Sequence, residues 1–135
     1  MTMIARVQFR LSLPPGINSQ YSTVNGHRVL SAQARRWKKT ASGELSGVFD
    51  PGFQERARTG YLALFFDFYF ETPFKRDLDG GLKIALDVIC EALGTDDRRV
   101  VDIHLVKRID PLRPHMDVEL EILPTWSFDE DRPVL

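Results

Sequence analysis

The residues best suited to chemistry lie in two short acidic segments on either side of an apolar stretch. The first segment reads Lys75-Arg76-Asp77-Leu78-Asp79-Gly80-Gly81-Leu82-Lys83, and the second contains the pair Asp96-Asp97, whose second residue follows Lys83 by fourteen positions. Alternate aspartates, a lysine and a later acidic pair could together hold a divalent metal ion beside a phosphodiester. This pattern indicates a nuclease.

Electrostatics gives a reason for such a cluster. Carboxylates brought within about 5 Å repel one another by roughly 3 kcal/mol per pair at an effective dielectric constant near 20, unless a cation neutralises them. Hard carboxylate oxygens favour Mg²⁺, with Mn²⁺ as a possible substitute. The Lys83 ammonium could then offset charge on the transition state.

The same residues also allow a purely structural interpretation. Asp79 could cap a helix, and Asp77 with the Asp96-Asp97 pair could be turn residues. Lys83 and Asp87 have the i, i+4 spacing of an ordinary surface ion pair. The spacing alone leaves both interpretations open.

Composition indicates one ordinary soluble domain. The chain has 135 residues, 43% of them apolar, and we expect a single domain over residues 1–123 with a C-terminal tail over 124–135. The single cysteine, Cys90, and the lack of a signal-peptide apolar core predict a cytoplasmic protein, which as a nuclease would be nucleoid-associated. Residues 1–40 carry seven basic and no acidic side chains, which suits either a basic surface for phosphates or, over residues 35–39, an ordinary solvated helix face.

Hydrophobic periodicity predicts the elements that position these residues. Apolar residues alternate over 3–13, 62–70, 101–105 and 116–122, as in half-buried strands, and recur at helical spacing over 82–93 with Gly94 placed to end the helix. A second helix should start at Ser31 and run to about Thr40, whereas 14–21 and 41–59 read as irregular. We therefore expect an α+β fold, in which a largely antiparallel four-stranded sheet is covered by two main helices.

These motifs resemble the RusA-type Holliday junction resolvases. That family carries an Arg-Asp-x-Asp-Asn motif at a helix start, a lysine on the helix and an Asp-Asp-x-x-Val segment after it. Here the matching residues are Arg76-Asp77-Leu78-Asp79, Lys83 and Asp96-Asp97-Arg98-Arg99-Val100. Pro14-Pro15, Asn18, Tyr21 and Ser31-Ala32 resemble the family's N-terminal loop and helix start, so the similarity covers roughly residues 7–123.

The resemblance implies a RusA-like fold and a homodimeric, Mg²⁺-dependent endonuclease that nicks four-way DNA junctions in recombination and repair. It assigns Asp77, Asp79 and Asp97 as catalytic metal ligands, Lys83 as the catalytic lysine and Asp96 as an accessory acid. Gly80 replaces the family's asparagine. The alternatives are therefore a junction-binding protein with reduced or lost catalysis and a metal-dependent hydrolase of a smaller phosphate ester.

Two further expectations concern assembly and DNA. A helix over 80–93 would be about 20 Å long, and the four residues after it reach back at most about 14 Å, so Asp79 and Asp97 could belong to composite sites shared by two subunits. The best candidates for DNA contacts are Arg35, Arg36, Lys38, Lys39, Lys75, Arg76, Asn18 and Tyr21.

Overall fold

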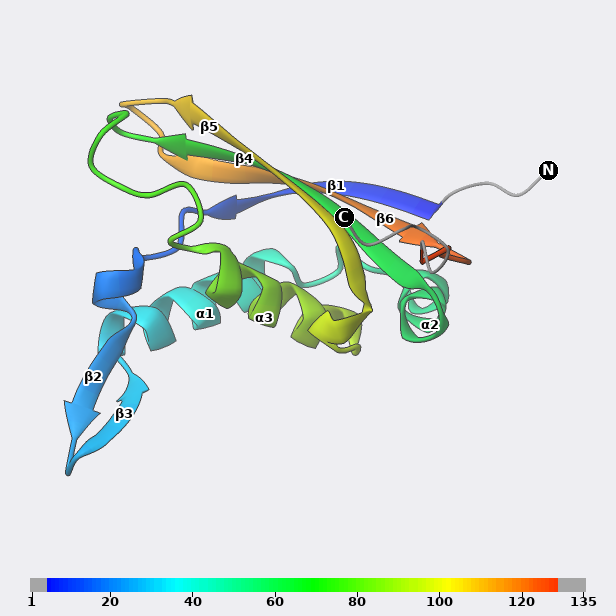
Figure 1. The fold of residues 1–135 in the computed structure, drawn as a ribbon, viewed down its shortest axis with the longest axis horizontal. Coiled ribbons are helices and arrows are strands. Elements are labelled where there is room, and N and C mark those ends of the chain that lie inside the picture. Colours follow the sequence, from blue (N-terminus) through cyan, green and yellow to red (C-terminus); the bar gives the residue numbers. More distant parts are fainter. Residues whose placement is uncertain (1–4, 129–135) are drawn as a thin grey trace, which may run out of the picture.

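The protein is built on one four-stranded sheet, seen in a computed structural model that describes residues 5–128 (Figure 1). The strand order is β1-β6-β4-β5. The bounds of these strands are β1 Ala5–Ser12, β4 Tyr61–Phe70, β5 Val100–Ile109 and β6 His115–Leu123. The four strands predicted from apolar alternation are therefore confirmed.

The sheet is mixed rather than largely antiparallel. β6 pairs antiparallel with both β1 and β4, but β4 and β5 run parallel. The cause is the crossover between them, because helix α3 (Leu82–Leu93) carries the chain back to the end of the sheet at which β4 began. β5 therefore starts beside the start of β4 and runs in the same direction. The expectation of a largely antiparallel sheet is corrected on this point, while the α+β class is confirmed.

Three α-helices cover the same face of the sheet, where two were expected (Figure 1). Helix α1 (Ala32–Glu44) begins at the predicted residue, because the Ser31 side chain caps it by accepting from the Ala34 amide. Helix α2 (Pro51–Thr59) lies in a region expected to be irregular, and there Asp50 is the N-cap and Pro51 the first helical residue. The proline was therefore a helix-start signal rather than a sign of irregular chain.

The core lies between the sheet and these helices. Helix α3 buries one broad side, and Gly94, in the left-handed conformation, ends it as predicted. Its buried residues are Ile84, Ala85, Leu86, Val88, Ile89, Cys90 and Leu93. They pack with inward-facing strand residues such as Phe66, Phe68 and Leu120. Trp37 of α1 is buried as well and donates its indole N–H to the Ser12 carbonyl.

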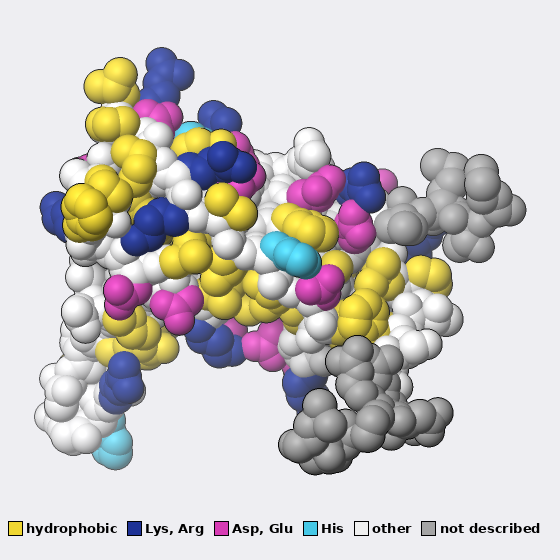
Figure 2. Space-filling view, turned by 45° about the horizontal axis from the view of Figure 1, so that its top comes forward, with side chains coloured by type: hydrophobic (Ala, Val, Ile, Leu, Met, Phe, Trp, Pro, Cys, Tyr) yellow, Lys and Arg dark blue, Asp and Glu magenta, His cyan; other side chains and the backbone are white. Residues whose placement is uncertain are grey.

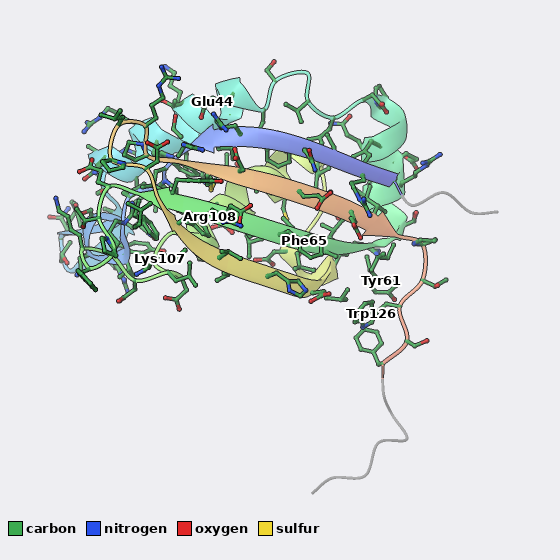
Figure 3. All side chains as sticks on the ribbon, turned by 90° about the horizontal axis from the view of Figure 1, so that it is seen from above. Glu44, Tyr61, Phe65, Lys107, Arg108 and Trp126 are labelled. Carbon is green, nitrogen blue, oxygen red and sulfur yellow. The ribbon has the colours of Figure 1, made fainter. Side chains whose placement is uncertain are left out.

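The opposite face of the sheet is uncovered and carries cross-strand ion pairs. Figure 2 shows acidic and basic side chains interspersed with apolar ones there, and Figure 3 shows Phe65 and Arg108 on this face. Arg10 pairs with Asp117 at 2.7 Å and Arg108 with Asp67 at 2.9 Å. Antiparallel strands such as β1 and β6 commonly face water on one side, and here the parallel pair β4–β5 does so as well.

A separate two-stranded hairpin projects from the body (Figure 1). It consists of β2 (Tyr21–Val24) and β3 (His27–Leu30), and the short 3₁₀ turn η1 (Ile17–Ser19) precedes it. A second 3₁₀ turn, η2 (Asp97–Arg99), precedes β5. The last strand of the main sheet ends at Leu123. The division into a domain over 1–123 and a tail over 124–135 stays a prediction. Residues 129–135 of that tail lie outside the described part of the chain. Within residues 5–128, no helix is both long and apolar enough to span a membrane.

Two loops that come together beside the start of α3 are packed closely enough to require glycine. A Cβ placed on Gly81 would lie 2.5 Å from Cγ of the Pro14 ring. The Gln20 side chain, which is buried, joins the same loops by donating to the Pro15 carbonyl at 2.9 Å and the Gly80 carbonyl at 2.7 Å. The N-terminal loop is thus fixed against the first acidic segment.

We predict that Gly81→Ala destabilises the protein by about 1–3 kcal/mol, because the rigid proline ring cannot yield without moving its backbone. The matched control is Gly43→Ala in helix α1, where a Cβ meets nothing within 4 Å. The control should stabilise the protein by roughly 0.5 kcal/mol through helix propensity. Urea unfolding of both variants measures the difference, and equal stabilities would contradict the close approach.

Candidate functional site

The clearest cluster of charged side chains around the predicted site surrounds the Lys83 ammonium on the solvent side of α3. Its Nζ lies 2.6 Å from Oδ2 of Asp97 and 3.0 Å from Oδ1 of Asp87. All three side chains are substantially exposed, with 63% of Lys83, 34% of Asp97 and 40% of Asp87 accessible. One cation therefore bridges two solvent-accessible carboxylates.

Local structure explains how Asp97 reaches a lysine in the first turn of the helix. After Gly94 the chain folds back, and the Thr95 amide donates to the Cys90 carbonyl. Asp96 then caps η2 by accepting from the Arg98 amide at 2.8 Å, which leaves Asp97 directed toward α3. Asp97 therefore reaches Lys83 within one chain, despite the length of the helix. A site shared between two subunits stays a prediction.

The cluster lines an open pocket of about 220 Å³. Its lining residues are Lys83, Asp87, Cys90, Glu91, Thr95, Asp96 and Asp97. Four of these side chains are carboxylates and one is cationic. Glu91 also pairs with Lys38 of α1 at 3.2 Å, and Asp96 with Arg98 at 3.2 Å. Asp97 and Asp87 therefore depend on Lys83 for their neutralisation.

Proton affinities follow from these contacts. Hydrogen bonds from Lys83 to Asp97 and then to Asp87 raise the pKa of the ammonium, which stays charged. The Arg98 backbone amide, and then its side chain, lower the pKa of Asp96. Burial, followed by repulsion from Asp97 and Asp87, raises the pKa of the Cys90 thiol to about 11. Cys90 thus lines the pocket as a neutral thiol.

Asp77 and Asp79 occupy the turn before α3, and both are exposed. The carbonyl of Asp77 accepts from the Gly80 amide, and that of Asp79 accepts from the Leu82 amide. Gly80 does not have a positive φ, and a Cβ there would meet the Asp77 carbonyl at 3.4 Å. The backbone therefore does not require glycine at position 80.

The structure brings together only part of the expected metal-binding set. Across residues 5–128, no group of three or more His, Cys, Asp or Glu side chains is arranged to hold a metal ion. Asp97 contacts Lys83, but no contact joins Asp97 to Asp77 or Asp79 among the described hydrogen bonds and ion pairs. The assignment of Asp77, Asp79 and Asp97 as joint ligands stays a prediction.

Two residues of this region were missed as functional candidates. Asp87 was interpreted as structural, yet it shares the Lys83 ammonium with Asp97; its i, i+4 spacing was the available signal. Lys107 of β5 donates to the carbonyls of Pro73 and Arg76, so it positions the first acidic segment. No sequence pattern marks Lys107, because the contact depends on the parallel pairing of β4 and β5.

The expected basic residues are only partly free. Arg35 donates to the Leu30 carbonyl, and Lys38 is paired with Glu91, whereas Arg36, Lys39 and Lys75 are exposed. Arg76 lies over the Phe70 ring, and its Nε and Nη2 atoms are buried without hydrogen-bond partners. Burial lowers the pKa of Arg76. Asn18 lies in η1, and Tyr21 begins β2.

Comparisons with known proteins return no relative by sequence. No protein-family model matches the chain, and no curated protein matches it.

Three similar solved structures are 2C-methyl-D-erythritol-2,4-cyclodiphosphate synthases. One has 14% identity and a TM-score of 0.35, covering 90% of this chain and 99% of its own. A CDP-bound form has 12% identity and a TM-score of 0.35, with the same coverage. The Plasmodium vivax structure has 12% identity and a TM-score of 0.33, covering 90% of this chain and 97% of its own. Likeness at this level assigns no activity to the chain.

The comparisons contradict the RusA-type interpretation. No family model supports it, and the solved structures reported above are synthases rather than resolvases. The predictions of junction endonuclease activity, of a junction binder without catalysis, and of a homodimer on four-way DNA are therefore wrong on these comparisons. Nucleoid association is left without support. The physical reason is that aspartate is common at caps and turns, as Asp96 illustrates, so short acidic motifs are weak markers of a family.

We predict a specific pH dependence of stability from Cys90. Its folded pKa is raised, so the stabilisation by the neutral thiol is full below pH 9 and is lost as pH rises toward 11. Between these pH values, the unfolding free energy of the native protein should fall relative to Cys90→Ala by about 2 kcal/mol. Urea unfolding of both proteins at several pH values measures this, and a constant difference would contradict it.

Proposed function

We propose that the protein is an enzyme that hydrolyses a small phosphate ester with the help of a divalent cation, Mg²⁺ or Mn²⁺. The observation that carries the proposal is the single ammonium of Lys83 shared by Asp97 and Asp87 at the mouth of an open acidic pocket. Carboxylates that are exposed, adjacent and neutralised by only one lysine are suited to a hard cation.

The few carboxylates at this open pocket suit Mg²⁺ better than a metal ion that protein ligands enclose completely. Mg²⁺ keeps several waters and commonly takes one or two carboxylates, with substrate phosphate oxygens completing its shell. Asp97 and Asp87 contact the same nitrogen, so the two carboxylates are close enough to serve one site. Asp77 and Asp79 remain proposed additional ligands from the turn before α3. A bound cation would supply an acidified water and charge stabilisation.

Lys83 would hold positive charge against the phosphate group. Its raised pKa keeps the ammonium protonated, so it acts as a charge and a hydrogen-bond donor rather than as a base. Asp97 accepts from this ammonium and thereby orients it toward the pocket. Asp96, held by Arg98, would act as an accessory acid that positions Asp97 through η2. A cytoplasmic location remains part of the proposal, because a free thiol such as Cys90 persists in a reducing compartment.

We predict that Mn²⁺ binds saturably at this pocket and that Asp97→Asn weakens the affinity by about tenfold or more, since a charged ligand becomes neutral. Paramagnetic broadening of backbone amides around Thr95 and Asp87 measures the binding. The matched control is Asp102→Asn on the uncovered sheet face, whose carboxylate pairs with His104. Unchanged Mn²⁺ affinity in Asp97→Asn would contradict the proposed ligand.

We also predict Mg²⁺-dependent release of p-nitrophenol from p-nitrophenyl phosphate or bis(p-nitrophenyl) phosphate. Lys83→Gln should lower kcat/KM by about 10²-fold, because it removes charge at the phosphate. Asp97→Asn should raise the Mg²⁺ concentration needed for half-maximal activity by about tenfold or more, because it removes a charged ligand, while Asp102→Asn should retain both activity and the Mg²⁺ dependence. Absence of turnover in a protein that binds Mn²⁺ would exclude these substrate classes, and equal loss in the control would reject the site.

A further inference from the structure

The projecting hairpin β2–β3 is fixed at its base, although Leu30 is its one residue that packs against the core within residues 5–128. Its turn, Asn25-Gly26, has φ values of 50° and 77°, which suit a tight two-residue hairpin. An isolated two-stranded hairpin is only marginally stable in water. Here the base is fixed, because Ser31 donates its amide to Gln20 and its hydroxyl to Ser19, and the Gln20 side chain is bonded to the body through Gly80.

A pocket of about 370 Å³ lies on this hairpin and the turn before it. Its lining residues are Ile17, Asn18, Tyr21, Ser22, Thr23, Gly26 and Arg28. Asn18, Tyr21, Thr23 and Arg28 can donate hydrogen bonds through an amide, hydroxyls and a guanidinium, and none of the lining residues is acidic. Thr23 pairs with Arg28 across the hairpin, so these two side chains share the face of Tyr21, and Ser22 lines the pocket through its backbone. This set of donors is complementary to an oxyanion.

Arg28 is placed to be the main contact. Its guanidinium carbon lies 4.1 Å from the centre of the Tyr21 ring, so the ring fixes the cation while leaving its N–H groups at the edge. Within residues 5–128, no carboxylate pairs with Arg28, and the chain contains no acidic residue before Glu44. The positive charge of Arg28 is therefore not neutralised locally.

We propose that this pocket, formed by Arg28 over Tyr21 with Asn18 and Thr23, binds a phosphate group. The planar guanidinium supplies a two-pronged donor that matches phosphate geometry, and the amide and hydroxyls supply further donors. The group is either free inorganic phosphate or the phosphate of a monoester. The site is separate from the acidic pocket on α3 and does not depend on the proposed hydrolysis.

The test is a titration of the full chain with inorganic phosphate, in EDTA and at constant ionic strength, followed by backbone amide chemical shifts. Saturable shifts at Ser22, Thr23 and Gly26 are expected, with none for chloride. Arg28→Gln should raise the dissociation constant for phosphate at least about fivefold. Arg28→Lys should recover part of the lost affinity, because it restores the charge but not the two-pronged donor of the guanidinium. Phenyl phosphate in a parallel titration distinguishes the two sources, since tighter binding than phosphate indicates a monoester.

The matched control is Arg113→Gln, which removes an exposed arginine from the β5–β6 loop and should leave phosphate binding unchanged. Asp97→Asn should also leave it unchanged, so failure of the hydrolase proposal does not affect this one. Retained affinity in Arg28→Gln, equal losses in Arg28→Gln and Arg113→Gln, shifts centred outside the hairpin, or shifts that never saturate would each overturn the phosphate site. The spectrum of Arg28→Gln reports folding directly, and the exposed position of residue 28 leaves the core untouched.

Discussion

Packing of helix α3 against the inner face of the sheet is the interaction on which the rest of the molecule depends. Seven side chains of the helix are almost fully excluded from water, namely Ile84, Ala85, Leu86, Val88, Ile89, Cys90 and Leu93. Burial of each large aliphatic side chain among them contributes about 1.5–3 kcal/mol. The helix is also the crossover that makes β4 and β5 parallel. Both acidic segments are therefore placed by one helix, because the first leads into it and the second leaves it.

The contacts within the acidic pocket contribute little to this stability. Exposed ion pairs such as Lys83 with Asp97 and Asp87 are commonly worth less than 1 kcal/mol each, because water and salt screen them. The fold would survive their rearrangement. A lysine that can leave its carboxylates without unfolding the protein is suited to exchange them for a cation and a phosphate group.

The uneven charge of the chain becomes spatially separate features in the folded protein. The acid-free N-terminal region forms β1, the hairpin and most of α1, whereas acidic side chains occur both at the pocket on α3 and on the uncovered sheet face. On the sheet face the charges are paired across strands, as with Arg10 and Asp117. Arg28 on the hairpin has no carboxylate partner within residues 5–128, and at the pocket Asp97 and Asp87 share one lysine. Charge of opposite sign is thus available at two separate places.

The sequence by itself determined the local elements, because each depends on neighbours along the chain. Alternating apolar residues located the four strands, helical spacing located α3, and Ser31 and Gly94 marked helix ends. Only the tertiary structure decided the parallel β4–β5 pairing, the contact of Asp97 with Lys83 and Asp87, and the bond from Lys107 to the first acidic segment. These depend on how distant segments pack, which short motifs do not encode. For the same reason the acidic motifs located a plausible site but misidentified the family, since aspartates at caps and turns satisfy local rules in many unrelated folds.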